Sequence, residues 1–186
     1  MIIALSGPSG IGKGFMKESV LAGYPDAKEL VWYTTRAPRP NETNRKSISE
    51  EQFASLADAG KLALVQGIFG HRYGVAVDDL LEKSGIWLTE IHPFVVADAK
   101  QINSELRLIG LVTDDLDLLR ERLTLRRKTE KPDEIGLRLK TAIDEMESIK
   151  KNAPMFERIV TISRDNESSI PIIAQEIVLN HLKEGE

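Results

Sequence analysis

A glycine-rich stretch close to the N-terminus restricts the possible fold more than any other feature of the chain. The apolar run Ile2–Ser6 predicts a buried strand, and Lys13–Leu21 can form a helix directly after the letters GPSGIG. Glycines at such a junction let successive backbone N–H groups turn toward phosphate oxygens, and the helix N-terminus adds positive dipole. Strand, loop and helix together predict a phosphate-binding loop in an α/β protein.

The loop is expected to bind ATP. Lys13 carries a mobile ammonium group that suits the β- and γ-phosphates of a nucleotide, so we expect it to be a catalytic residue. The alternative is a glycine-rich turn that holds a lysine by chance. The residues expected to bind ATP are those of the loop itself: Gly7, Pro8, Ser9, Gly10, Ile11, Gly12, Lys13 and Gly14.

The last position of the loop departs from the pattern G-x-x-x-x-G-K-[ST]. Gly14 stands where a serine or threonine hydroxyl would bind Mg²⁺. The expected Mg²⁺ would then rest on phosphates, on water and on a carboxylate from another strand. Glu90, near the end of the apolar run Ile86–Ile91, is the expected metal residue, acting through water. A solvated carboxylate at a strand end is the alternative interpretation.

Strands and helices alternate along most of the chain, which indicates a parallel sheet with helices on both faces. The region 35–85 breaks this alternation and is expected to form an inserted lobe. Within it, Ser49 predicts the start of a helix that stops at Gly60. Further strands are expected at Glu29–Thr34, Ile86–Ile91, Leu106–Thr113 and Arg158–Ser163, with helices at about 94–104, from 114, at 135–151 and at the C-terminal end.

The composition is that of a globular protein. The chain has 186 residues, 41% hydrophobic and 29% charged, with no cysteine, which excludes disulfides and thiolate metal sites. A net charge of −4 argues against a broad nucleic-acid surface, and no apolar run approaches the roughly 20 residues of a membrane span. The N-terminus lacks a signal-peptide pattern. We therefore expect a cytoplasmic protein whose partners are small-molecule substrates, with no nucleic-acid or membrane partner.

Several motifs in order resemble those of the guanylate kinase family. GPSGIGKG and YTTRAPRP resemble its GPSGxGK and TTRxPRxGE, and GHRYGV, LTEI and LRERLTLRRKTE resemble its later segments, at least to Leu139. The resemblance implies a P-loop kinase fold and a transfer of the γ-phosphate of ATP to the phosphate of a small acceptor. It also implies a core (1–34, 86–126 and 142–186), an acceptor-binding lobe (35–85) and a lid (127–141).

The resemblance assigns roles to individual side chains. In the family, the arginines of TTRxPR and the second tyrosine of G-N-Y-Y-G hold the acceptor phosphate, and these match Arg36, Arg39 and Tyr73. Two guanidinium groups and a phenol suit a phosphate dianion. Glu90 and His92, in the segment that resembles the family's L-(D/E)-I-D, complete the expected acceptor-binding set.

The family's lid arginines, which stabilise charge on the transferring phosphoryl group, match Arg122, Arg126 and Arg138. The spacing here is longer by one residue, so Arg127 could take the place of Arg126. Arginines that face developing charge are what phosphoryl transfer needs. A solvated basic helix face is the alternative interpretation of this group.

The positions that read guanine in the family have lost their polar groups. They match Trp32, Leu64, Val75 and His92. An unpaired polar group on a buried guanine would cost about 1–3 kcal/mol, so this pocket should bind guanine poorly. The phosphate-holding residues are kept, which points to a phosphorylated acceptor other than GMP.

A second resemblance concerns the segment after TTRAPRP, where the family's DGxDYxF is shortened to NRKSI. This spacing is similar to that of ribose 1,5-bisphosphate phosphokinases, whereas Arg39 and the letters PRP resemble guanylate kinases. Three interpretations stay open: a kinase of a nucleoside monophosphate, a kinase of ribose 1,5-bisphosphate that forms phosphoribosyl pyrophosphate, and a non-catalytic binding module.

Overall fold

A computed structural model describes residues 1–39, 42–81, 83–126 and 132–184. The predicted alternative arginine Arg127, together with residues 128–131 of the predicted lid, lies outside the described residues. Arg126 ends a helix, but its side chain also lies outside the described part.

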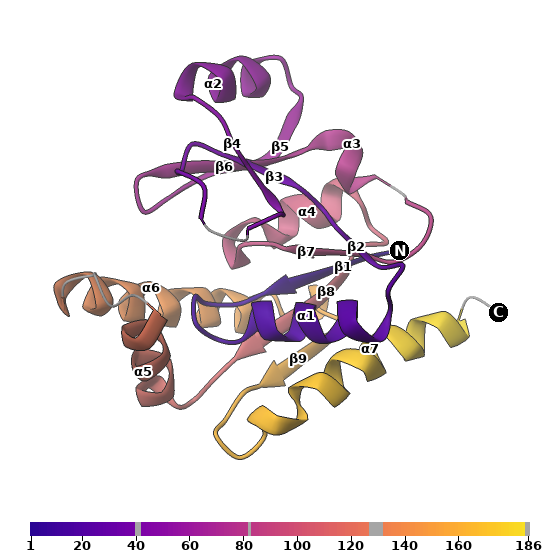
Figure 1. The fold of residues 1–186 in the computed structure, drawn as a ribbon, viewed down its shortest axis with the longest axis vertical. Coiled ribbons are helices and arrows are strands. Elements are labelled where there is room, and N and C mark those ends of the chain that lie inside the picture. Colours follow the sequence, from indigo (N-terminus) through magenta and orange to yellow (C-terminus); the bar gives the residue numbers. More distant parts are fainter. Residues whose placement is uncertain (40–41, 82, 127–131, 185–186) are drawn as a thin grey trace.

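Five parallel strands form the main sheet, as predicted (Figure 1). β1 lies in the centre, and β7 and β8 flank it, so the glycine-rich loop leaves the middle of the sheet at its carboxyl edge. The spatial order is β2 (Lys28–Glu29), β7 (Trp87–Glu90), β1 (Ile2–Ser6), β8 (Arg107–Val112) and β9 (Arg158–Thr161).

Helices cover both faces of this sheet. α1 (Lys13–Gly23) and α7 (Ile170–Glu184) pack together on one face, and α4 (Val96–Ile102) and α6 (Pro132–Lys151) lie on the other. α5 (Leu116–Arg126) follows β8 and packs against α6. Short 3-10 helices occur at η1 (Pro93–Val95), η2 (Ala153–Met155) and η3 (Glu167–Ser169).

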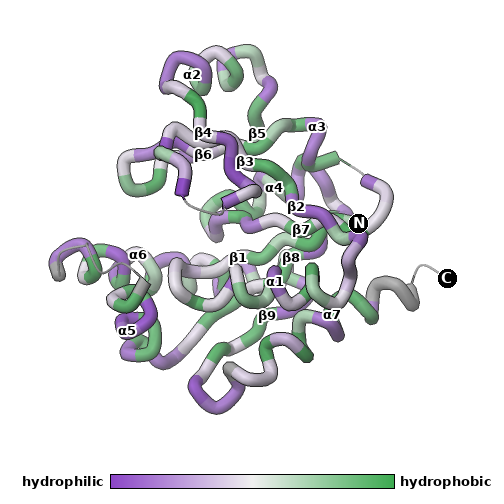
Figure 2. The backbone as a smooth tube through the Cα atoms, in the orientation of Figure 1, coloured by the Kyte–Doolittle hydropathy of each residue, from purple (hydrophilic) through white to green (hydrophobic). Residues whose placement is uncertain are grey.

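The alternation of side chains along β1 explains the two layers. Ile3 and Leu5 point into the cluster that includes α1 and α7, and Ile2 and Ala4 point into the cluster that includes α4 and α6. All five residues of β1 are buried, so the strand is apolar on both faces, as expected for the centre of a parallel sheet. Figure 2 shows hydrophobic residues concentrated along these central strands.

A second sheet of four strands forms the inserted lobe. Its spatial order is β4 (Arg45–Ser47), β3 (Trp32–Thr34), β6 (His71–Ala76) and β5 (Leu62–Ile68), and it carries the helices α2 (Glu50–Asp58) and α3 (Val77–Leu80). The predicted helix start is confirmed, because Ser49 and Gln52 form a reciprocal capping box. The sheet begins at Trp32, three residues before the predicted start of the lobe.

The prediction of one strand over Glu29–Thr34 is wrong. The backbone N–H of Leu30 still donates to Leu88 in the main sheet, but that of Trp32 donates to Asn44 in the lobe. The chain therefore changes hydrogen-bonding partner within two residues and passes from one sheet to the other. Local sequence preferences favour an extended backbone in this segment, but the change of hydrogen-bonding partner depends on distant segments.

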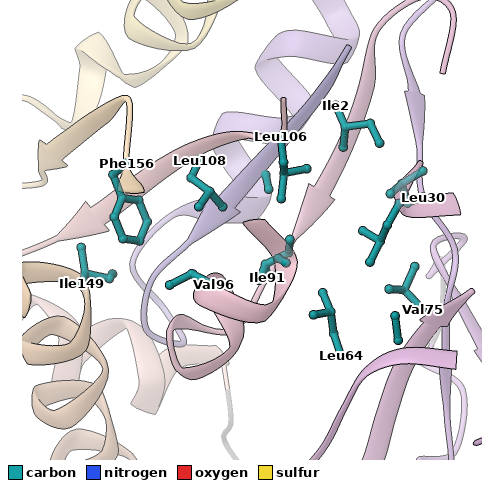
Figure 3. Packing of buried hydrophobic residues seen from close by; sticks show 14 of the residues in the cluster. Ile2, Leu30, Leu64, Val75, Ile91, Val96, Leu106, Leu108, Ile149 and Phe156 are labelled. Atoms are coloured by element: carbon teal, nitrogen blue, oxygen red, sulfur yellow. The ribbon is translucent and has the colours of Figure 1, made fainter. Parts of the chain in front are cut away.

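The lobe shares a buried core with the main sheet (Figure 3). Leu64 and Val75 of the lobe belong to the same cluster as Ile91 and Val96 near the end of β7, and the cluster continues to Ile149 of α6. This continuous packing holds the lobe over the carboxyl edge of the main sheet. No helix among the described residues is long and apolar enough to span a membrane.

Candidate active site

A cleft of about 740 Å³ lies between the glycine-rich loop, the lobe and the helices α5 and α6. It gathers most of the residues predicted from the sequence, although they come from six separate segments. The predicted residues that line it are Gly7, Ser9, Gly10, Gly12, Lys13, Gly14, Arg36, Arg39, Tyr73, Glu90, His92, Arg122 and Arg138. Of the remaining predicted loop residues, Ile11 is buried in the core, and Pro8 contributes its carbonyl oxygen to the loop.

The loop is folded tightly around Lys13. Lys13 Nζ donates to the carbonyl oxygens of Gly7 at 2.6 Å and Pro8 at 2.9 Å. A Cβ atom at Gly7 would lie 2.5 Å from the carbonyl oxygen of Leu111, and Gly10 has φ +85°, so both positions require glycine. The loop therefore needs its glycines for close backbone packing, which is the property that lets backbone N–H groups face a phosphate.

Arg122 brings α5 onto this loop. Its Nη1 donates to the carbonyl oxygens of Ile11 at 3.0 Å and Gly10 at 3.3 Å. Leu119 and Leu123, on the same helix, lie close to Gly10. The guanidinium group expected to face the transferring phosphoryl group thus lies beside the loop expected to bind ATP.

Gly14 opens toward the cleft. A Cβ atom built there would meet no heavy atom within 4 Å among the described residues. Steric crowding therefore does not explain the absence of a serine or threonine at position 14, because the cleft has room for a side chain there.

A buried ion-pair cluster that the sequence interpretation missed lies next to the loop. Lys17 Nζ lies 2.6 Å from Glu29 Oε1 and 3.0 Å from Glu90 Oε1, and Asn44 donates to Glu29 at 3.0 Å. The Lys17 side chain is only 9% exposed. Lys17 follows Lys13 by one helical turn, so the same helix face presents both ammonium groups; this spacing was the available signal.

These cations dominate the electrostatics of Glu90. Burial alone would raise the pKa of the Glu90 carboxyl, but Lys13, Lys17 and Arg45 more than offset burial and lower the pKa to about 2. Burial also tends to lower the pKa of Lys17, but the two carboxylates raise it overall. Glu90 is therefore ionised and already paired at neutral pH.

The acidic side chains of the described residues determine how this part of the protein could hold Mg²⁺. Within the described ranges, no group of three or more His, Asp or Glu side chains could hold a metal ion. Gly14 offers no hydroxyl, and one oxygen of Glu90 accepts a hydrogen bond from Lys17. Contact of Glu90 with the metal through water stays a prediction.

The residues predicted to hold an acceptor phosphate lie on the lobe side of the cleft. Arg36 is buried and donates two hydrogen bonds to the Glu42 carboxylate, at 2.7 and 2.6 Å. Burial would lower the pKa of Arg36, but Glu42 and Tyr73 raise it. The Arg36 guanidinium therefore lies beside the Tyr73 phenol, with Nη2 held by Glu42 and Nη1 by the carbonyl oxygen of Ala37, while Arg39 is exposed at the cleft.

The residues that match the guanine-reading positions of guanylate kinases pack against other parts of this protein. Trp32, Leu64 and Val75 are buried in the shared core, and Trp32 Nε1 donates to Thr89 Oγ1 at 2.8 Å. His92 Nε2 lies 2.8 Å from Glu145 Oε1 of α6, and its Nδ1 accepts from the Phe94 backbone. The indole and imidazole nitrogens are thus engaged by the protein itself.

The shortened segment NRKSI contributes side chains that the sequence did not predict. Asn44 and Arg45 both line the cleft, and the Arg45 guanidinium lies 5.9 Å from the centre of the Trp32 ring. Across the cleft, the Arg138 guanidinium lies 4.0 Å from the centre of the Phe69 ring. Motif matching had no signal for these pairs, because each joins segments distant in the sequence.

The parallel sheet, the glycine-rich loop after its first strand and the inserted lobe define the fold class as that of P-loop kinases. Among solved structures, a guanylate kinase from Anaplasma phagocytophilum matches with a TM-score of 0.69 and 21% identity, over 99% of this chain and 85% of that one. A shikimate kinase from Acinetobacter baumannii matches with a TM-score of 0.52 and 12% identity, over 98% and 93%. Both support the fold.

Sequence relatives give the family. The chain is 33% identical to the guanylate kinase of Frankia casuarinae over 147 residues, covering 76% of this chain and 79% of the relative. It is 34% identical to that of Lactobacillus acidophilus over 156 residues, covering 78% and 74%. No family model matches. The chain belongs to the guanylate kinase family, and the predictions of fold class and of a phosphotransferase enzyme are confirmed.

Proposed function

We propose that this protein is an ATP-dependent kinase whose acceptor is a small phosphorylated molecule other than GMP. The observation that carries the proposal is the meeting, in one cleft, of the Lys13 loop with Arg36, Arg39 and Tyr73. The first suits a nucleotide triphosphate, and the second suits an acceptor phosphate.

In the proposed reaction, an oxygen of the acceptor phosphate forms a bond to the γ-phosphorus of ATP. The bond from this phosphorus to the β,γ-bridging oxygen breaks, and ADP leaves with the bonding electrons. Lys13 and the loop amides would hold the β- and γ-phosphates, and Arg122 and Arg138 would balance charge on the transferring group. Arg126 is proposed for the same role. No covalent enzyme intermediate is needed, because positioning and electrostatics supply the catalysis.

The cofactors in this proposal are ATP and Mg²⁺. Mg²⁺ would arrive with the nucleotide and take its ligands from phosphates and water, with Glu90 as a partner through water.

We also propose the division into core, acceptor-binding lobe and lid that the resemblance implies, and a location in the cytoplasm.

The exclusion of GMP rests on the filled base positions. Trp32 and Val75 are buried, and the nitrogens of Trp32 and His92 are engaged by Thr89 and Glu145. A guanine placed there would lose hydrogen bonds to water without replacing them. The polar side chains Asn44 and Arg45 in the same cleft favour a polar acceptor body, and ribose 1,5-bisphosphate is the candidate of that kind.

The test is a measurement of ADP release from Mg-ATP with GMP, AMP, other nucleoside monophosphates and ribose 1,5-bisphosphate. We expect turnover with an acceptor other than GMP and its loss in Lys13→Ala. Lys28→Ala removes a lysine that contacts Trp87 outside the cleft and should keep turnover. Preference for GMP would refute the acceptor argument, and turnover in Lys13→Ala would refute the loop mechanism. ATP binding without turnover on any acceptor would favour a binding module.

A further inference from the structure

Phe69 occupies a backbone position that disfavours a bulky side chain. Ile68 pairs with His71, so Phe69 and Gly70 form a two-residue turn between β5 and β6, with φ +48° and +79°. Positive φ at both residues is the pattern of a type I′ turn, which favours Asn-Gly or Asp-Gly. The backbone is therefore strained at Phe69, and backbone strain of this kind tends to persist where function requires the residue.

Burial of the aromatic ring does not explain why a phenylalanine stands at position 69. Its side chain is 41% exposed, so the strain is not offset by removal of the ring from water. The ring instead lies across the cleft against α6, with the Arg138 guanidinium 4.0 Å from its centre. Figure 1 shows the β5–β6 turn on the side of the molecule where α6 lies. An arginine over an aromatic face is held by cation–π attraction and stacking.

Arg138 belongs to the part of α6 that packs on α5. Its neighbours Ile135 and Leu139 are buried with Leu119 and Leu123, so the helix backbone is fixed there, and the long Arg138 side chain extends from it to the Phe69 ring. Phe69 and Arg138 both line the cleft. The ring therefore restricts the directions in which the guanidinium can point.

We propose that Phe69 is a positioning residue that holds Arg138 toward the reacting phosphates and thereby links the acceptor-binding lobe to the helix that carries this arginine. This inference rests on the proposed function, in which Arg138 balances charge on the transferring group. An arginine oriented before the reaction loses less freedom in the transition state, so the contribution falls on kcat.

The test compares three variants with the wild type in the ADP-release assay and in thermal unfolding. Phe69→Asn should lower kcat three- to tenfold while the melting temperature stays equal or rises, because Asn suits the turn. Phe69→Tyr keeps the ring and should stay within about twofold of wild-type kcat. Leu179→Asn removes an exposed apolar side chain of α7, which does not line the cleft, and should leave kcat unchanged.

A double-variant cycle isolates the link to Arg138. In the Arg138→Ala background, Phe69→Asn should cause no further loss of kcat. Wild-type kcat in Phe69→Asn, or an equal loss in both backgrounds, would overturn the inference and leave the proposed function intact. Absence of turnover in the wild type would overturn the proposed function and this inference together.

Discussion

Lys17 donates a hydrogen bond from Nζ to Oε1 of Glu90 at 3.0 Å, although the two residues are 73 positions apart in the sequence. The contact joins the first helix to the end of β7, directly beside the loop expected to bind ATP. Because Glu29 lies 2.6 Å from the same ammonium group, one buried cation holds two carboxylates.

Lys17→Met should destabilise the fold. Removal of the cation leaves Glu29 and Glu90 as neighbouring carboxylates with little access to water, and breaking a buried pair in this way costs about 3–5 kcal/mol. Urea unfolding measures the loss. The matched control is the triple variant Lys17→Met, Glu29→Gln, Glu90→Gln, which removes both carboxylates together with the Lys17 cation and should recover much of the stability. Equal stability of Lys17→Met and the wild type would contradict the structural role of the cluster.

The stability of the protein should fall in acid because of Glu90. The folded-state pKa of this carboxyl is about 2, below its ordinary value of 4.5, so its contribution is complete above pH 4.5 and is lost as the pH falls toward 2. The contribution is about 3 kcal/mol, by the usual conversion of a pKa difference to free energy. Urea unfolding between pH 6 and pH 2.5 checks this. Glu90→Gln should flatten the profile in that range, and an unchanged acid slope in this variant would refute the assignment.

Gly14→Ser should improve the use of magnesium. The cleft has room for the new side chain, and a serine at this position completes the G-x-x-x-x-G-K-[ST] pattern. We expect half-maximal turnover at a lower Mg²⁺ concentration, measured by titration at fixed ATP. Gly14→Ala is the control: it adds a Cβ and about 0.8–1 kcal/mol of helix preference but no hydroxyl. The same Mg²⁺ dependence in both variants would contradict a role for the hydroxyl.

Trp32 and Thr89 should behave as a coupled pair. Trp32→Phe leaves the buried Thr89 hydroxyl without the indole N–H that it accepts, at a cost of about 1–3 kcal/mol. Thr89→Val should cost a similar amount, because it leaves the indole N–H unpaired. The double variant should be less destabilised than the sum of the two, as measured by urea unfolding. Strict additivity would show that the hydrogen bond between Trp32 and Thr89 does not couple the two residues in the stability of the fold.

Much of the core was predictable because its signals are local. The apolar run Ile2–Ser6 and the N-cap Ser49 act within a few residues, and both appear in the structure as expected. The letters VDDLLEKSG, residues 77–85, predict a short helix that ends at Gly85, but α3 extends only over Val77–Leu80, since helix ends are set by weaker and competing preferences. The start of α6 at Pro132 also precedes the predicted position, because proline is well suited to a first helical turn.

Some residues of the candidate site could likewise be predicted from local motifs, and others could not. Lys13, Arg36 and Arg122 occur in motifs whose spacing can be matched along the chain, and the structure brings them into one cleft. Lys17 and Phe69 could not be assigned from spacing, because their partners Glu90 and Arg138 lie far away in the sequence. Their roles depend on which helix faces which strand or turn.

The sequence by itself determined the order of strands and helices, the phosphate-binding loop and the residue types available for phosphoryl transfer, because these follow from periodicity and short motifs. Only the tertiary structure decided that the segment after Glu29 leaves the main sheet and that the Trp32 indole is buried with its N–H bonded to Thr89. It likewise placed two carboxylates around Lys17. The physical reason is that hydrogen-bond partners, burial and charge pairing are properties of segments that meet in space, and one local stretch does not specify its distant partner.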